Sequence, residues 1–161
     1  MSKTATYSLI ESQTLGSATA TVTFSSIPGT FTDLILIIRA TTLSANYNMR
    51  FNGDTGTNYS DTSLWGNGSS AASYRSSNNT VIGLTYTSSG APISRIQIQD
   101  YSNATTYKTV LTRQDDSVNA AGCNVGLWRN TAAITSISIV SPGTIPSGTT
   151  LKLYGIQAGN A

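Results

Sequence analysis

The sequence contains no histidine, a single cysteine and few charged side chains. Without imidazole the chain cannot build a Ser-His-Asp triad, a histidine-activated cysteine or a histidine zinc site. The lone Cys123 has no partner for a disulfide within the chain, and we interpret it as a small buried apolar residue. Among common catalytic devices, paired carboxylates remain.

Charge is sparse, and long apolar runs are absent. Charged residues make up 10% of the 161 residues, against about 25% in an average globular protein. The nine cations are scattered, so we expect no nucleic-acid partner. The longest apolar run, Leu34–Ile38, is far shorter than the ~20 residues of a membrane helix, so we expect no membrane partner. The N-terminus lacks the apolar segment of a signal peptide, which predicts synthesis in a reducing cytoplasm without export.

Serine and threonine make up about 30% of the chain, and the 39% apolar content is enough for a core. Ser, Thr, Asn and Gly disfavour helices, whereas alternation such as that of Ala18–Phe24 is typical of strands. About ten strand-like runs occur at the spacing of an all-β sandwich. The sequence therefore predicts a single antiparallel β-sandwich of jelly-roll type over residues 6–161, with residues 1–5 as an N-terminal arm. The predicted strands are Thr6–Leu15, Ala18–Phe24, Phe31–Thr41, Tyr47–Phe51, Val81–Tyr86, Ile93–Tyr101, Tyr107–Arg113, Asn119–Trp128, Ile134–Val140 and Thr149–Ile156.

The segment Asp54–Asn79 is the largest predicted loop. It is rich in Asn, Gly and Ser and has no sustained periodicity, and loops of this length are often functional. Its aromatic side chains can stack on sugars or anchor a protein interface, and its carboxylates can hydrogen-bond to a ligand. The spacing of the carboxylates does not match a calcium-binding EF-hand, so we expect neither a metal nor a cofactor. The candidate interface or ligand-contact residues are Asp54, Tyr59, Asp61, Trp65 and Tyr74.

An enzyme of this composition would need two carboxylates in one cleft, as in glycoside hydrolysis. The candidates are Asp54, Asp61, Asp100, Asp115 and Asp116. Two of them are adjacent and fall in a predicted turn, where aspartate commonly accepts backbone N–H groups. We therefore expect a protein that is not an enzyme.

The predicted surface is polar without being charged. Threonine and serine favour strands but provide little like-charge repulsion between copies of the chain. Natural edge strands are usually protected by charge or proline, and such protection is scarce here. The sequence therefore predicts a protein that packs against other molecules.

Seven short motifs are spread along nearly the whole chain. They are Tyr7–Ile10, Gln13–Leu15, Val22–Pro28, Thr32–Leu34, Met49–Asp54, Asn58–Ser60 and Leu151–Ile156. Together they resemble β-sandwich virion proteins of tailed bacteriophages, in particular the capsid decoration, or cement, proteins. Similar sequences also look like tail or fibre components.

The resemblance implies a structural subunit of the virion that assembles with itself as a homotrimer. It also implies a second partner, the phage major capsid protein, on the capsid surface, where the subunit stabilises the lattice. The alternative is a tail-fibre or receptor-binding module that contacts host surface glycans through Asp54–Asn79. Hundreds of copies in each virion would indicate the head, and a handful would indicate the tail.

Overall fold

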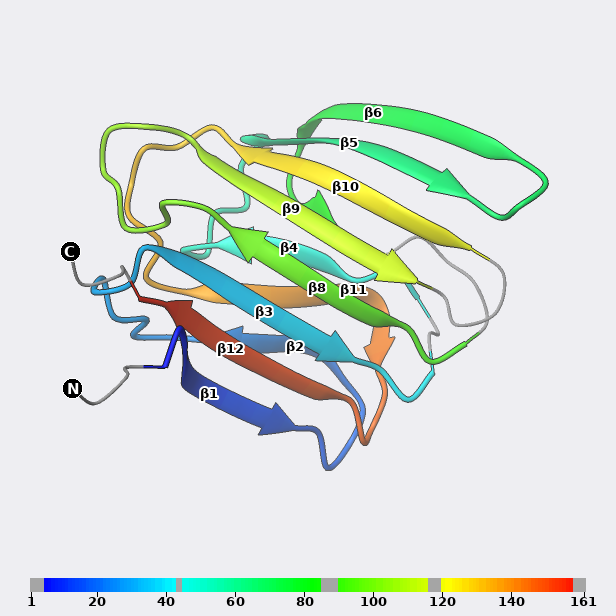
Figure 1. Cartoon of the computed structure of the whole chain (residues 1–161), viewed down its shortest axis with the longest axis horizontal. Coiled ribbons are helices and arrows are strands. Elements are labelled where there is room, and N and C mark those ends of the chain that lie inside the picture. The colour runs from blue at the N-terminus through cyan, green and yellow to red at the C-terminus, as the bar shows by residue number, and fades with distance from the viewer. Residues whose placement is uncertain (1–4, 43–44, 85–89, 116–119, 158–161) are drawn as a thin grey trace.

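The computed structural model describes residues 5–42, 45–84, 90–115 and 120–157, which form two antiparallel β-sheets packed face to face (Figure 1). The larger sheet has the strand order β1 (Tyr7–Thr14), β12 (Thr150–Ile156), β3 (Asp33–Arg39), β8 (Ile93–Ile98), β9 (Lys108–Asp115), β10 (Ala121–Trp128), β5 (Tyr59–Gly66) and β6 (Ala71–Asn79). The smaller sheet has the order β2 (Thr19–Phe24), β11 (Ile137–Ile145), β4 (Asn48–Phe51) and β7 (Ile82–Gly83). Within the described ranges no helix is long and apolar enough to cross a membrane.

Eight of the strands form a jelly roll. Each of four early strands pairs with one of four late strands in reverse order: β1 with β12, β2 with β11, β3 with β8, and β4 with β7. Successive strands of this set lie in different sheets, except where β4 is followed by β7, so the paired strands wrap as one folded ribbon. The predicted all-β antiparallel sandwich of jelly-roll type is confirmed.

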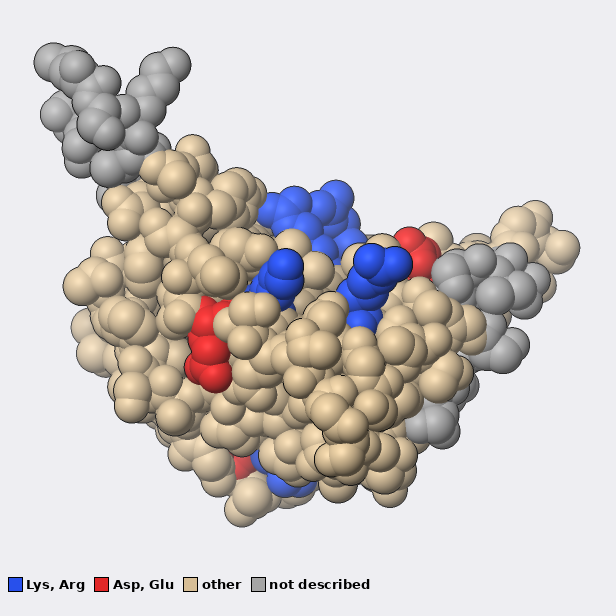
Figure 2. All heavy atoms as spheres, turned by 90° about the horizontal axis from the view of Figure 1, so that it is seen from below, with Lys and Arg blue, Asp and Glu red and all other residues tan. Residues whose placement is uncertain are grey.

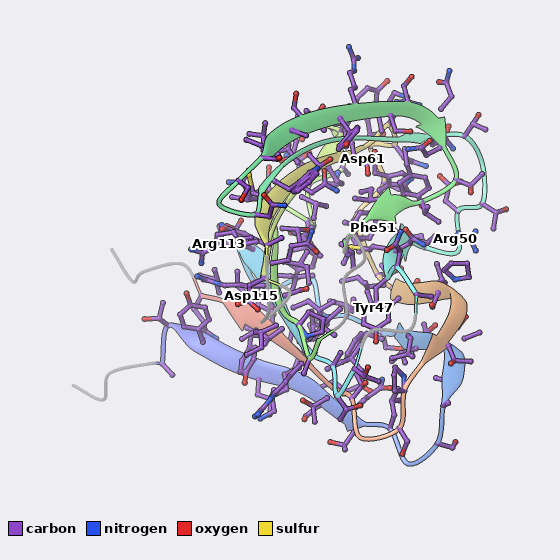
Figure 3. All side chains as sticks on the ribbon, turned by 90° about the vertical axis from the view of Figure 1, so that its right-hand side faces the viewer. Tyr47, Arg50, Phe51, Asp61, Arg113 and Asp115 are labelled. Atoms are coloured by element: carbon purple, nitrogen blue, oxygen red, sulfur yellow. The ribbon has the colours of Figure 1, made fainter. Side chains whose placement is uncertain are left out.

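The other four strands enlarge one sheet only. β9 and β10 are inserted between β8 and β11, and β5 and β6 are inserted between β4 and β7. Both insertions join the same side of the larger sheet, in the order β8-β9-β10-β5-β6. We call β9, β10, β5 and β6 the extension. Seen from its end, the extension arches over the interior (Figure 3).

Alternating side chains explain how the two sheets share one core. In β2, Val22 and Phe24 are buried while Thr21 and Thr23 are exposed, as the sequence predicts. The apolar run in β3 is buried on both faces of an interior strand, since Leu36 lies in the core and Ile35, on the opposite face, is only 1% exposed. Each buried side chain of this size stabilises the fold by roughly 1.5–3 kcal/mol.

The prediction of a long loop over Asp54–Asn79 is wrong. Most of this segment forms the antiparallel strands β5 and β6. Asn67 closes the connection between them: its amide N–H donates to the Ser70 carbonyl at 3.0 Å, and its side-chain oxygen accepts from the Ser69 and Ser70 N–H groups. Of the predicted N-terminal arm, residues 1–4 lie outside the described ranges.

Gly126 on β10 determines how closely the two sheets approach. A Cβ atom at this position would overlap the side chain of Ile82 on β7. We predict that Gly126→Ala lowers the free energy of unfolding by about 1–3 kcal/mol, the usual cost of overpacking a core. Urea denaturation measures the change. Gly16→Ala is the matched control, because a Cβ atom there meets nothing within 4 Å. Equal effects of the two substitutions would contradict the prediction.

Candidate functional site

The sequence-predicted contact residues lie on the extension and on the turn that leads into it. Tyr59, Asp61 and Trp65 belong to β5, and Tyr74 belongs to β6, while Asp54 precedes β5. In β5, the odd-numbered residues from 59 to 65 face inwards and the even-numbered ones face outwards. The extension therefore has two chemically different faces, which we describe in turn.

Asp61 fastens the inner face of the extension to the smaller sheet. Its side chain is 8% exposed, and its Oδ2 accepts hydrogen bonds from the Gly83 N–H at 3.1 Å and from Asn124 Nδ2 at 3.3 Å. Its Oδ1 accepts from Asn79 Nδ2 at 3.3 Å, and Asn124 Nδ2 also donates to the Gly83 carbonyl. One carboxylate thus joins β5, β6, β7 and β10, and Figure 3 shows it under the arch.

Asp54 has a similar structural role at the end of β10. Its carboxylate accepts from Trp128 Nε1 at 2.7 Å, from Asn58 Nδ2 at 2.9 Å and from the Gly56 N–H at 2.8 Å. Partial burial raises the pKa of Asp54, but these three hydrogen bonds outweigh it, so the pKa lies below its ordinary value. The carboxylate is therefore ionised and engaged with the protein itself.

Tyr59 belongs to the core rather than to a contact surface. Its side chain is fully buried, and its ring stacks on Trp128 with centroids 6.4 Å apart. Its hydroxyl donates to the Asp54 carbonyl at 3.1 Å and accepts from the Phe51 N–H at 3.1 Å. Burial raises the pKa of Tyr59 to about 12. The sequence-based assignment of Tyr59 as a contact residue is corrected on this ground, and burial removes Asp61 from the contact set in the same way.

Trp65 and Tyr74 are the members of the candidate set that reach the surface of the hairpin. Trp65 is half-buried and lies opposite Ala72, while Tyr74 is 57% exposed and lies opposite Ser63. Both rings therefore belong to the same face of the β5–β6 pair, in diagonally neighbouring positions. Their role in ligand contact remains a prediction.

A row of polar side chains crosses the inner face of the extension. Thr112, Asn124 and Ser63 lie side by side on β9, β10 and β5, and each is at most 2% exposed. Within the described part of the chain, the two hydroxyl oxygens and the Asn124 amide oxygen have no hydrogen-bond partner. This row helps to explain why β5 has no apolar alternation in the sequence: two of its four inward-facing positions, Asp61 and Ser63, are polar.

The outer face of the extension carries apolar side chains in contact with solvent. Leu111 and Val125 face each other on β9 and β10 and are 40% and 52% exposed. Leu64 on β5 is 55% exposed and lies opposite Cys123, which is half-buried rather than buried as predicted. These side chains place an apolar, solvent-exposed area on the outer face of the extension.

Lys108 is a buried group that sequence reasoning missed. It is 1% exposed on the inner face of β9, and its ammonium donates to the carbonyls of Thr106 at 2.6 Å and Thr131 at 3.1 Å. Burial lowers the pKa of Lys108, and the Asp100 carboxylate partly opposes this. A lysine between a tyrosine and a threonine gives no signal of burial in the sequence.

The carboxylates occupy different parts of the fold. Asp61 faces the interior, whereas Asp115 lies at the end of β9 on the outer face of the same sheet (Figure 3). In the turn after β8, the Asp100 N–H donates to the carboxylate of Asp33 on β3. Asp116 lies outside the described residues. Among the described residues, no group of three or more carboxylate or cysteine side chains is placed to hold a metal ion.

The chain matches no protein-family model, and no curated protein sequence is similar to it.

The Asp54 carboxylate provides a pH-dependent test of the turn before β5. Because its pKa is lowered in the folded state, its contribution to stability is present above the unfolded pKa of about 3.9 and is lost as the pH falls through the folded pKa. We predict that Asp54→Asn lowers the free energy of unfolding by about 1–3 kcal/mol at pH 7 and by less at pH 2.5. Denaturation at both pH values measures the difference, and an equal loss at the two would show that the charge is not responsible.

Proposed function

We propose that the protein is a non-enzymatic structural subunit of a tailed-phage virion, a decoration protein that binds the outside of the head and stabilises the major capsid lattice. The observation that carries the proposal is the extension: four strands added to a jelly roll, with one face and one edge left uncovered. Such a surface suits a rigid module that packs against other molecules. The residues that looked chemically active in the sequence, Asp54, Tyr59 and Asp61, are engaged in holding the fold.

The edge strand β6 supports self-association. It is nine residues long, contains no proline, carries a single charge at Arg75 and is exposed at all but two positions. In the pairing of β6 with β5, the register shift between Tyr59 and Ser60 lies at one end of β6, whereas the opposite edge, β1, is interrupted within the strand by a register shift between Leu9 and Glu11. An unprotected edge can pair with another chain. Where the edge meets a different surface of the next copy and the rotation between copies closes, such contacts form a ring. The phage resemblance adds that the ring has three members.

The motifs behind that resemblance lie mostly in core strands. Met49–Asp54 forms β4 and the turn that follows it, and Leu151–Ile156 lies within β12. These motifs therefore support a fold like that of virion proteins, and they do not distinguish a position in the head from one in the tail. The assignment to the head therefore needs a test on the particle itself.

The second candidate function is a tail module that contacts host glycans. The observation that favours it is the position of Trp65 and Tyr74 on one face of the β5–β6 hairpin. Two aromatic rings on a polar strand pair can stack on a sugar. This function needs few copies per virion, whereas lattice stabilisation needs hundreds.

Removal of the protein from phage heads tests the leading proposal. A protein that binds only the assembled lattice shifts the equilibrium towards assembly, so we predict that stripped heads release DNA at a lower temperature than decorated heads. Calorimetry of both samples measures the change, and adding back purified protein should restore the original temperature. Equal heat tolerance would contradict the proposal, and a few copies per virion would favour the tail module.

Charge placed on β6 tests self-association. We predict that Ser76→Lys with Ser77→Lys converts the oligomer to monomers, because charged side chains on an edge strand block its pairing with another chain. Sedimentation velocity measures the mass of the protein oligomer. The matched control, Ser17→Lys with Thr55→Lys, adds the same charge at exposed positions outside the strands. An unchanged oligomer in the β6 variant would show that the edge is not the contact.

A further inference from the structure

The basic side chains of the protein are concentrated on one face. Five of the eight described lysine and arginine residues lie on the outer face of the larger sheet, and Figure 2 shows this face from its side, with the blue side chains gathered along the top. Two carboxylates, Asp33 and Asp115, lie on the same face within the described residues. The five cations are Arg39, Arg75, Arg95, Arg113 and Lys152.

Two of these cations face each other directly. Arg95 on β8 and Arg113 on β9 are cross-strand partners, and Lys152 belongs to the same row, separated from Arg95 by Ile37. Like charges directly opposite each other destabilise a sheet. Arg95 donates to the Tyr7 hydroxyl at 3.0 Å, a neutral partner that does not offset the charge. Within the described residues, the outer face therefore carries an excess of positive charge, five cations against the two carboxylates of Asp33 and Asp115.

The arginines border the exposed apolar residues of the extension. Arg113 lies opposite Cys123, and Leu111 and Val125 occupy the next row of the sheet. We define the outer patch as Leu64, Arg95, Leu111, Arg113, Cys123 and Val125. Arginine beside exposed aliphatic side chains is the composition of a protein interface, in which lysine is depleted.

The chemistry of the outer patch selects its partner. A face-to-face contact between two copies would place these arginines against each other. A nucleic acid would bind the guanidinium groups but would leave the leucine and valine side chains unmatched. A surface of another protein that presents carboxylates around apolar side chains satisfies both features.

We infer that the outer patch is the docking surface for an acidic, partly apolar surface of a different protein. This inference rests on the proposed function where it identifies that protein as a component of the virion. Under that function, the patch faces the capsid lattice and the β6 edge serves contacts between copies. The two surfaces can then be disrupted independently of each other.

Arg113 and Arg50 form a matched pair for the test. Figure 3 shows them on opposite sides of the sandwich, and Arg50 lies on β4 of the smaller sheet with a hydrogen bond to the Thr80 carbonyl at 3.1 Å. Arg113→Glu and Arg50→Glu change the net charge equally. Arg113→Glu also places a carboxylate opposite Arg95, so we expect its thermal midpoint to be equal to or higher than that of the wild type.

The experiment measures binding of the wild type and both variants to stripped heads, isolated tails and double-stranded DNA. We predict that Arg113→Glu weakens binding to heads at least tenfold and that Arg50→Glu binds heads as tightly as the wild type does. We also expect added NaCl to weaken the binding of the wild type more than the binding of Arg113→Glu. Val125→Thr, which changes shape little, should weaken head binding severalfold without changing its salt dependence.

The outcomes separate the patch from the proposed function. If both arginine variants bind heads as tightly as the wild type does, the proposal for the outer patch is wrong and the decoration role is unaffected. If the wild type binds tails but not heads, and Arg113→Glu abolishes that binding, the assignment to the head is wrong and the proposal for the outer patch stands. Binding to DNA alone, or to no virion component, would overturn both.

Discussion

A four-stranded sheet cannot cover an eight-stranded one. This mismatch in width determines which strands of the larger sheet are held by apolar packing and which need other contacts. Over the jelly-roll strands, apolar side chains of the two sheets meet and exclude water, which is the main stabilising contribution in folding. Beyond β8 the cover narrows: β7 packs against β10 and β5, while most of β6 remains exposed. The extension therefore needs contacts of another kind to keep its position.

Carboxylates provide those contacts. Asp61 joins four strands under the arch, and Asp54 holds the indole of Trp128 and the turn before β5. Hydrogen bonds to a charged group contribute more than neutral ones, roughly 1.5–3 kcal/mol each, and the loss of one carboxylate leaves several donors unpaired. The same acidic side chains that suggested ligand contact in the sequence thus hold the extension in its position.

The sequence predicts the apolar part of this fold and misses its polar part. The alternation in β2 and the apolar run in β3 are visible without coordinates because their buried positions are hydrocarbon. β5 and β6 are not visible, because Asp61 and Ser63 occupy core-facing positions and their partner Asn124 lies about 60 residues away. For the same reason the sequence places Tyr59 in a surface loop, whereas its side chain is fully buried.

The uncovered face and edge have different consequences for association. A β-edge such as β6 offers backbone groups and accepts any extended strand, so its selectivity depends on the side chains around it. The outer patch has the opposite character: its side chains stand on the face of a sheet, where the like charges of Arg95 and Arg113 lie opposite each other and repel. Relief of that repulsion makes binding to an acidic surface more favourable and binding to a like-charged copy less so. Under the proposed function, the edge would serve contacts between copies and the face would serve contacts with a different protein, which is the division of contacts that a lattice-stabilising oligomer requires.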